Sequence, residues 1–405
     1  MIQILEVRVM RQKRKGKGFA HYAFKLFKYP LRLFLKRRLN VQIIRNEAKN
    51  DRGPFLVIGN HVTNYDPLIV LAYTKPLIRF VAASNNYDHW FKRLIFRLAR
   101  VIAINKRTQD ARTIREILTE VKQGSSIGVF PEGGRTWDGA TDVIIYSTAK
   151  LIKFLKLPVY NQRLIGGYLS TPRWCRYRRK GRIDVDIYRM FTPEEIERLS
   201  DQEIYERLLK ELDVNDYAIQ RKRMIPFKGK NRAEYIERLL YVCPNCHAFN
   251  RMKSSGDHFY CQACGSKGTV NVYGFIEGDF PFDNLVDFNR YQKQMLQEYV
   301  HNKPFSSIVV NDVPYRAIGP DGAFRDTIQL TIQREGLKLE GKKRILSLPW
   351  STLSEPSITF HHTLTIFEQE IRHQFIIEPY LQETSIVFLY EMIKLLRGEN
   401  HDGLA

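Results

Sequence analysis

Short apolar runs alternate with amphipathic runs between about residues 41 and 232. Runs such as FLVIGN (55–60) and SIGVF (126–130) predict buried strands. By contrast, DARTIREILTEVKQG (110–124) has helical spacing and ends at a glycine. Alternating strands and helices are typical of an α/β layer. We therefore predict an α/β domain over 41–232, with a mixed sheet flanked by helices.

The rest of the chain falls into four segments with different patterns. Residues 1–40 are basic and helical, 233–278 carry two cysteine pairs, and 279–304 are predicted to form a helical linker. Residues 305–405 contain short β-rich runs bounded by Gly, Pro, Asn and Asp, followed by an amphipathic helix. This order resembles a pleckstrin-homology-type barrel, which implies a module that contacts lipids or partners. A purely structural appendage explains the same order equally well.

The basic segment includes FAHYAFKLFKYPLRLFLKRRL (19–39), in which apolar side chains fall at helical spacing with cations between them. This pattern is typical of an interfacial helix at a membrane surface. A helix packed on the protein's own core shows the same stripe and is the alternative. The chain has 64 Lys and Arg against 43 Asp and Glu, a net charge of +21. That charge favours an anionic membrane surface or nucleic acid as a partner.

A turn with ionisable side chains follows the first predicted strand. It carries His61 and, five positions later, Asp66, which is expected to be the N-cap of a helix that begins with Pro67. Ligands of open α/β sheets bind at this carboxyl edge of the strands. If the turn brings the side chains together, Asp66 accepts from one ring nitrogen of His61 and leaves the other as a base. The alternative is that Asp66 only caps the helix and His61 is a solvated loop residue.

A second turn of the same kind follows the run at 126–130. It carries Glu132, Gly133, Gly134 and Arg135 at the same predicted edge. Glycines let backbone N–H groups approach an anion, and the Arg135 guanidinium matches a phosphate in bidentate geometry. A glycine-rich connection with a surface ion pair is the alternative. The two turns together favour attack by the hydroxyl of a phosphorylated alcohol.

These turns also carry a family resemblance. NHVTNYD (60–66) and FPEGGRT (130–136) are similar to the His-x4-Asp and Phe-Pro-Glu-Gly-x-Arg blocks of the glycerolipid acyltransferases. VIAINKR (101–107) and LPVYNQRLIGG (157–167) resemble the two other blocks of that family more weakly. The resemblance covers about residues 41–212.

The resemblance implies an O-acyltransferase that moves a fatty acyl chain from acyl-CoA or acyl carrier protein to the free hydroxyl of a lysophospholipid. The acceptor it favours is lysophosphatidic acid, which would give phosphatidic acid. It implies that His61 is the general base and that Asp66 orients it. The residues it assigns to the acceptor phosphate are Glu132, Gly133, Gly134 and Arg135, with help from Arg107.

Two departures from the family pattern leave the acceptor open. Gly134 stands where the family usually has threonine, and Tyr160 with Asn161 interrupts the fourth block. No apolar run reaches the about 20 uncharged residues that a spanning helix needs. Charge and resemblance together predict a peripheral membrane protein on the cytoplasmic face of a bacterial inner membrane, bound to anionic lipids.

Four of the five cysteines form two Cys-x-x-Cys pairs, with Cys175 apart. Cys243 and Cys246 precede Cys261 and Cys264 at the spacing of a zinc ribbon, which predicts a structural Zn2+ site with four thiolate ligands. Redox disulfides and an iron–sulfur centre are competing interpretations.

Zinc ribbons often bind nucleic acid, so the alternative function is a basic nucleic-acid-binding protein without enzymatic activity. The sequence lacks RNP-type, helix-turn-helix and finger motifs. This alternative also leaves the two turns unexplained, so nucleic acid is not the partner we expect.

Overall fold

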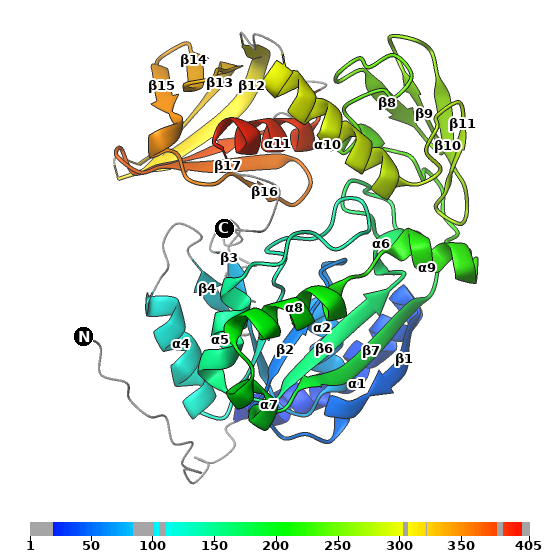
Figure 1. The fold of residues 1–405 in the computed structure, drawn as a ribbon, viewed down its shortest axis with the longest axis vertical. Coiled ribbons are helices and arrows are strands. Elements are labelled where there is room, and N and C mark those ends of the chain that lie inside the picture. The colour runs from blue at the N-terminus through cyan, green and yellow to red at the C-terminus, as the bar shows by residue number, and fades with distance from the viewer. Residues whose placement is uncertain are drawn as a thin grey trace.

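The computed structural model describes residues 19–83, 101–104, 111–302, 307–320, 322–378 and 384–398. These residues form three β-sheets, two of seven strands and one of four. In Figure 1 the first sheet and its helices occupy the lower half of the view, and the other two sheets lie above them.

The N-terminal sheet has the strand order β1-β7-β6-β2-β5-β3-β4. Only β6 and β7 pair antiparallel, and every other neighbouring pair is parallel. The predicted mixed sheet is therefore confirmed. Its strands are β1 (Val41–Asn46), β2 (Leu56–Gly59), β3 (Ile78–Ala83), β4 (Ile102–Ile104), β5 (Ser126–Val129), β6 (Val159–Ile165) and β7 (Ile183–Phe191).

Helices cover both faces of this sheet. Successive residues of β2 point to opposite faces: Val57 packs in a core with α1 and α2, and Ile58 packs in a second core with α5 and α8. The helices of this part are α1 (Phe19–Leu39), α2 (Asp66–Tyr73), α4 (Ala111–Lys122), α5 (Ser147–Leu155), α6 (Gly167–Ser170), α7 (Pro193–Arg198), α8 (Asp201–Leu212) and α9 (Asp216–Arg223).

Over residues 28–39, where its side chains are described, helix α1 buries one side against the domain. Leu31, Leu35 and Leu39 are buried, whereas Tyr29 and Phe34 are exposed. The alternative interpretation, a helix packed on the protein's own core, therefore holds for the buried side, and membrane association stays a prediction. None of the helices in the described parts of the chain has the length and apolar character that crossing a bilayer requires.

The second sheet contains the cysteine pairs. It is antiparallel, with the order β11-β10-β9-β8. Its strands are β8 (Met252–Ser255), β9 (His258–Cys261), β10 (Lys267–Val270) and β11 (Ile276–Gly278). Helix α10 (Leu285–Asn302) then leads to the third sheet.

The third sheet is an antiparallel sheet of order β15-β14-β13-β12-β18-β17-β16, followed by helix α11 (Ile386–Leu396). The predicted β-rich C-terminal region is confirmed, and its likeness to a pleckstrin-homology barrel stays a prediction. Its strands are β12 (Ile308–Gly319), β13 (Gly322–Ile332), β14 (Gly336–Gly341), β15 (Ile345–Pro349), β16 (Ser357–Thr359), β17 (Thr363–Glu368) and β18 (His373–Ile377).

One hydrophobic core runs through all three sheets. Val57 of the first sheet, Phe259 of the second and Leu389 of α11 belong to the same buried cluster. A hydrogen bond also links α10 to the first domain: the Asn289 side chain donates to Asp138 at 2.7 Å. Burying apolar surface between the sheets stabilises their mutual arrangement. The C-terminal sheet is therefore packed in place beside the first domain.

Candidate active site

Both predicted turns leave the sheet at the same edge. β2 and β5 are neighbouring parallel strands, with Ile58 paired to Val129, so their carboxyl ends lie side by side. The side chain of Asn60 holds the first turn to β6 through two hydrogen bonds with the backbone of Leu164, at 2.9 and 2.8 Å. The expected placement of the turns is confirmed.

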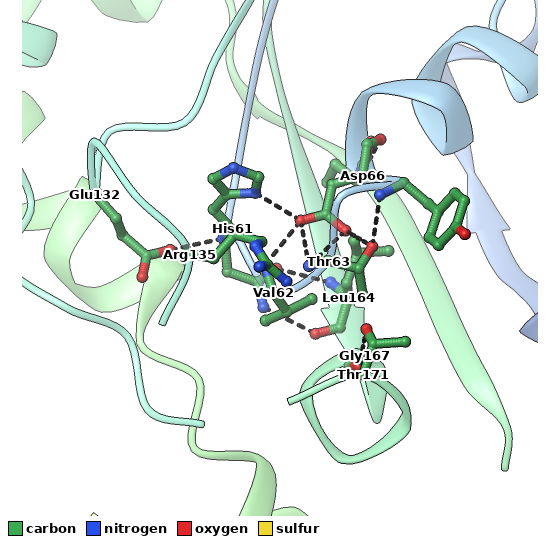
Figure 2. A network of polar contacts seen from close by, with 12 residues as sticks. His61, Val62, Thr63, Asp66, Glu132, Arg135, Leu164, Gly167 and Thr171 are labelled. Carbon is green, nitrogen blue, oxygen red and sulfur yellow. Dashed lines mark hydrogen bonds and ion pairs between the residues drawn. The ribbon is translucent and has the colours of Figure 1, made fainter. Parts of the chain in front are cut away.

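The first turn brings the imidazole of His61 against the carboxylate of Asp66. His61 Nδ1 lies 2.8 Å from Asp66 Oδ2 (Figure 2). The Asp66 side chain is fully buried, and 21% of the His61 side chain is exposed. A buried carboxylate at Nδ1 favours the tautomer that carries its proton there, which leaves Nε2 with a free electron pair. The pairing is the one that a histidine base requires.

Asp66 is held by more than the imidazole. Its carboxylate also accepts from the backbone N–H groups of Val62 and Thr63, at 2.8 and 2.9 Å, and from the Thr63 hydroxyl. These donors compensate for the burial of a charged group. They also hold the carboxylate in one orientation, because each donor is fixed by the turn.

The prediction that Asp66 is the N-cap of the helix is wrong by one residue. Asp66 is the first residue of α2, and Tyr65 occupies the cap position without a side-chain hydrogen bond. The carboxylate instead turns back to the N–H groups of the preceding turn. His61 does lie outside the helix, as predicted.

The second turn supplies an aromatic wall for the base. The ring of Phe130 stacks on the His61 imidazole, with ring centroids 4.4 Å apart and an interplanar angle of 18°. Phe80 stacks behind Phe130 at 5.9 Å. This packing and the bond to Asp66 together restrict the imidazole to one orientation.

Glu132 joins the two turns through the backbone. Its Oε1 accepts from the His61 N–H at 2.7 Å, and its Oε2 accepts from the Asp142 N–H at 3.0 Å. Burial raises the pKa of the Glu132 carboxyl to about 8, although both N–H donors favour its charged form. The Thr136 N–H donates to the His61 carbonyl at 3.0 Å, a second link between the turns. One Glu132 oxygen thus holds the histidine turn, and the other holds the backbone at Asp142.

The other residues of the second turn, Gly133 and Arg135, lie at the same edge of the sheet as His61. Within the described parts of the chain, no group hydrogen-bonds the Arg135 guanidinium. Burial lowers the pKa of Arg135, and the charge of Asp66 opposes that shift. Gly133 has φ +68°, which favours glycine, and its N–H is already bonded to the Phe130 carbonyl at 3.1 Å. Among the predicted anion ligands that the structure describes, Arg135 offers a guanidinium whose donors no described group uses.

One predicted arginine is not described by the structure, and one arginine that was not predicted contacts the second turn. Arg107, the remaining predicted ligand, lies outside the described residues. Arg173, which the sequence did not single out, donates to the Arg135 carbonyl at 2.7 Å and stacks on Trp137 at 4.4 Å. It lies 38 residues beyond Arg135 in a loop without a recognisable motif. Its position therefore depends on tertiary structure.

The four paired cysteines come together as the spacing predicts. Cys243 Sγ lies 3.7 Å from Cys264 Sγ, and Cys246 Sγ lies 3.7 Å from Cys261 Sγ. All four sulfurs lie within 4.8 Å of one another. Four thiolates at Zn–S distances of about 2.3 Å in a tetrahedron stand about 3.8 Å apart. The cluster therefore has the dimensions of a four-thiolate metal site.

Comparisons with known proteins cover the part of the chain that carries both turns. Residues 39–159 match the family model described as Acyltransferase. A 1-acyl-sn-glycerol-3-phosphate acyltransferase of Borreliella burgdorferi is 27% identical over 116 residues, which are 27% of this chain and 46% of that protein. A probable 1-acyl-sn-glycerol-3-phosphate acyltransferase of Mycoplasma pneumoniae is 31% identical over 100 residues, 23% of this chain and 37% of that protein. The chain thus spans less than half the length of both relatives.

A solved structure gives a weaker match. The 1-acyl-sn-glycerophosphate (LPA) acyltransferase PlsC from Thermotoga maritima has a TM-score of 0.42 and 19% sequence identity. The match covers 53% of this chain and 84% of that one. A likeness at this level carries no argument about function. The predicted resemblance to glycerolipid acyltransferases is confirmed by the family model and the two sequence relatives.

Proposed function

We propose that this chain, whose residues 39–159 match the acyltransferase family model, transfers a fatty acyl chain from an acyl thioester to the free hydroxyl of a lysophospholipid. The donor is acyl-CoA or acyl carrier protein, and lysophosphatidic acid is the preferred acceptor. One observation carries the proposal: the His61–Asp66 pair and the Arg135 guanidinium share one edge of the sheet. A base and a cation side by side match an acceptor that carries both a hydroxyl and a phosphate.

His61 acts as the base in the proposed reaction. Its Nε2 takes the proton of the acceptor hydroxyl while the oxygen attacks the thioester carbonyl carbon. An oxygen–carbon bond forms and the carbon–sulfur bond breaks, and the proton passes from His61 to the departing thiolate. Asp66 stabilises the charged imidazolium between these steps. General-base help of this kind contributes roughly 10²- to 10⁴-fold to the rate.

Arg135 holds the acceptor in place. Its guanidinium offers two parallel N–H donors to one phosphate, and its burial strengthens the interaction because water screens it less. Glu132 has a different role, because both of its oxygens already accept from backbone N–H groups. We assign Glu132 to positioning the histidine turn and Arg135 to binding.

Membrane attachment is proposed for the outer side of α1, on the cytoplasmic face. Tyr29, Leu33 and Phe34 are exposed on this helix, and Lys36 and Arg37 are exposed beside them. Exposed apolar groups among cations favour the interface of an anionic bilayer. A lysophospholipid acceptor is itself found in such a surface, so the two proposals agree.

Vesicle flotation tests the membrane proposal. Replacing Leu33→Gln and Phe34→Gln together is expected to abolish most binding to vesicles that contain phosphatidylglycerol. The matched control is Ile345→Gln, because Ile345 of β15 is 65% exposed and lies in the C-terminal sheet. Equal binding by the double variant and the control would rule out α1 as the attachment site.

For the cysteine cluster we propose a structural Zn2+. Four thiolates complete a tetrahedral shell, so the ion has no open position for water or substrate. The chemistry at His61 therefore proceeds without it. The ion would hold β8 to β11 together, which in turn supports the shared core.

Mass spectrometry of reaction products tests the proposed function. Purified protein is offered acyl-CoA or acyl carrier protein together with lysophosphatidic acid, lysophosphatidylcholine or monoacylglycerol. Phosphatidic acid is the expected main product. Arg135→Ala is expected to raise the KM for lysophosphatidic acid strongly, whereas the exposed control Arg112→Ala leaves it unchanged. Absence of any acylated product with every pair of substrates would refute the proposal.

A further inference from the structure

A hairpin of the C-terminal sheet reaches the candidate active site. β16 and β17 pair up to Thr359 and Thr363, so residues 360–362 form its tip. Arg173 Nη2 donates to the Ile358 carbonyl at 2.7 Å, and its Nε donates to the Phe360 carbonyl at 3.0 Å. Through Nη1 the same guanidinium donates to the Arg135 carbonyl, at 2.7 Å. One side chain therefore joins the hairpin to the residue proposed to bind phosphate.

The contact that Arg173 makes with the hairpin is buried. Arg173 is only 8% exposed and stacks on Trp137. Burial lowers its pKa to about 9, and nearby Arg135 acts in the same direction. Gly134 lies beside the guanidinium, since a Cβ added there would stand 3.4 Å from Arg173 Nη1, an ordinary contact distance.

The hairpin tip places an imidazole among cations. Burial, and then the charges of Arg238, His362, Arg135 and Arg176, lower the pKa of His361 to about 3. His361 is therefore neutral near pH 7 and keeps one N–H donor. No hydrogen bond joins either of its ring nitrogens to the residues that the structure describes. Arg238, Arg135 and Arg176 are cations that act on this ring, and a cluster of cations favours an anion, although Glu378 acts in the opposite direction on the neighbouring His362.

We propose that the hairpin tip forms a second wall of the acceptor site, where His361 donates a hydrogen bond to the phosphomonoester that Arg135 binds. The inference rests on the proposed function for the identity of the ligand. Arg173 acts as a positioning residue, because it holds the tip against the Arg135 turn without touching the phosphate itself. The C-terminal sheet then contributes to acceptor specificity, which a lone acyltransferase domain would lack.

Steady-state kinetics of the full chain test the inference. His361→Ala is expected to raise the KM for lysophosphatidic acid roughly tenfold or more, the effect of one hydrogen bond to a charged group. The kcat at saturating acceptor and the KM for monoacylglycerol, which has no phosphate, are expected to stay within about twofold. The matched control is His301→Ala, an exposed histidine of α10. Arg173→Lys is expected to change the same KM in the same direction.

Calorimetry with glycerol 3-phosphate and with inorganic phosphate separates this inference from the proposed reaction. If His361→Ala binds either probe more weakly than wild type does, the proposed anion site is supported. This result holds even if no acyl transfer is detected. Weakening for glycerol 3-phosphate alone identifies a headgroup site, and equal weakening for both identifies a general phosphate site. Unchanged KM and unchanged probe affinity in His361→Ala would overturn the inference.

Discussion

The Nδ1 atom of His61 lies 2.8 Å from Oδ2 of Asp66, and that oxygen also accepts from the Val62 N–H. The carboxylate is thus fixed by the turn that carries the histidine. Because the partner is fixed before any substrate binds, the imidazole needs no reorganisation when it takes a proton. Preorganised polar groups of this kind are a major source of catalytic rate.

Asp66→Asn is expected to impair both activity and stability. An amide has one acceptor oxygen, so its NH2 group would face N–H donors that the carboxylate now satisfies. We expect acyl transfer to fall on the order of 100-fold or more and the unfolding free energy to fall by about 1–3 kcal/mol. Activity assays and thermal unfolding measure the two losses. Thr63→Val, which removes only the hydroxyl donor, should lose less of each. An Asn variant as active as wild type would exclude the orienting role.

Glu132→Gln is expected to change how stability depends on pH. Burial raises the pKa of Glu132 from 4.5 to about 8. Between these values the folded protein holds a proton that the unfolded chain has released, so this group makes stability fall as the pH rises. Glutamine cannot ionise, so the variant does not lose this part of its stability as the pH rises. The Tm of the variant relative to wild type should therefore rise between about pH 5 and pH 8. A constant difference, or one that drifts the other way, would show that Glu132 is already charged in the folded protein.

Cys264→Ser is expected to remove the metal. Metal analysis of the purified wild type should give one zinc per chain, and the variant should give almost none. Because the second sheet shares its core with the other two, we expect the Tm to fall as well. Cys175→Ser, which changes the cysteine outside the pairs, is the control and should keep its zinc. Full zinc content in the Cys264→Ser variant would mean that the cluster is not the metal site.

Patterns local to a strand or turn predicted much of this protein. The apolar runs placed His61 and Arg135 at the carboxyl ends of neighbouring strands, and the cysteine spacing brought four sulfurs together. Both features depend on a few residues close in sequence, where periodicity and turn chemistry decide the geometry.

Features that depend on distant contacts were not predictable. Arg173 bonds carbonyls of the hairpin 185 and 187 residues away, and no motif marks such a pair. Glu132 was expected at the phosphate, yet its oxygens bond the backbone of His61 and Asp142. A short motif gives residue types and spacing, but it does not predict which backbone N–H groups donate to a given carboxylate.

The most direct test of His61 as the base is to measure acyl transfer by the His61→Ala variant. The variant and the wild type are compared with acyl-CoA and lysophosphatidic acid, by mass spectrometry of the phosphatidic acid formed. We predict that kcat falls by roughly 10²- to 10⁴-fold, with the Tm and the zinc content close to those of wild type. Turnover within a few-fold of wild type would contradict the assignment of His61 as the base.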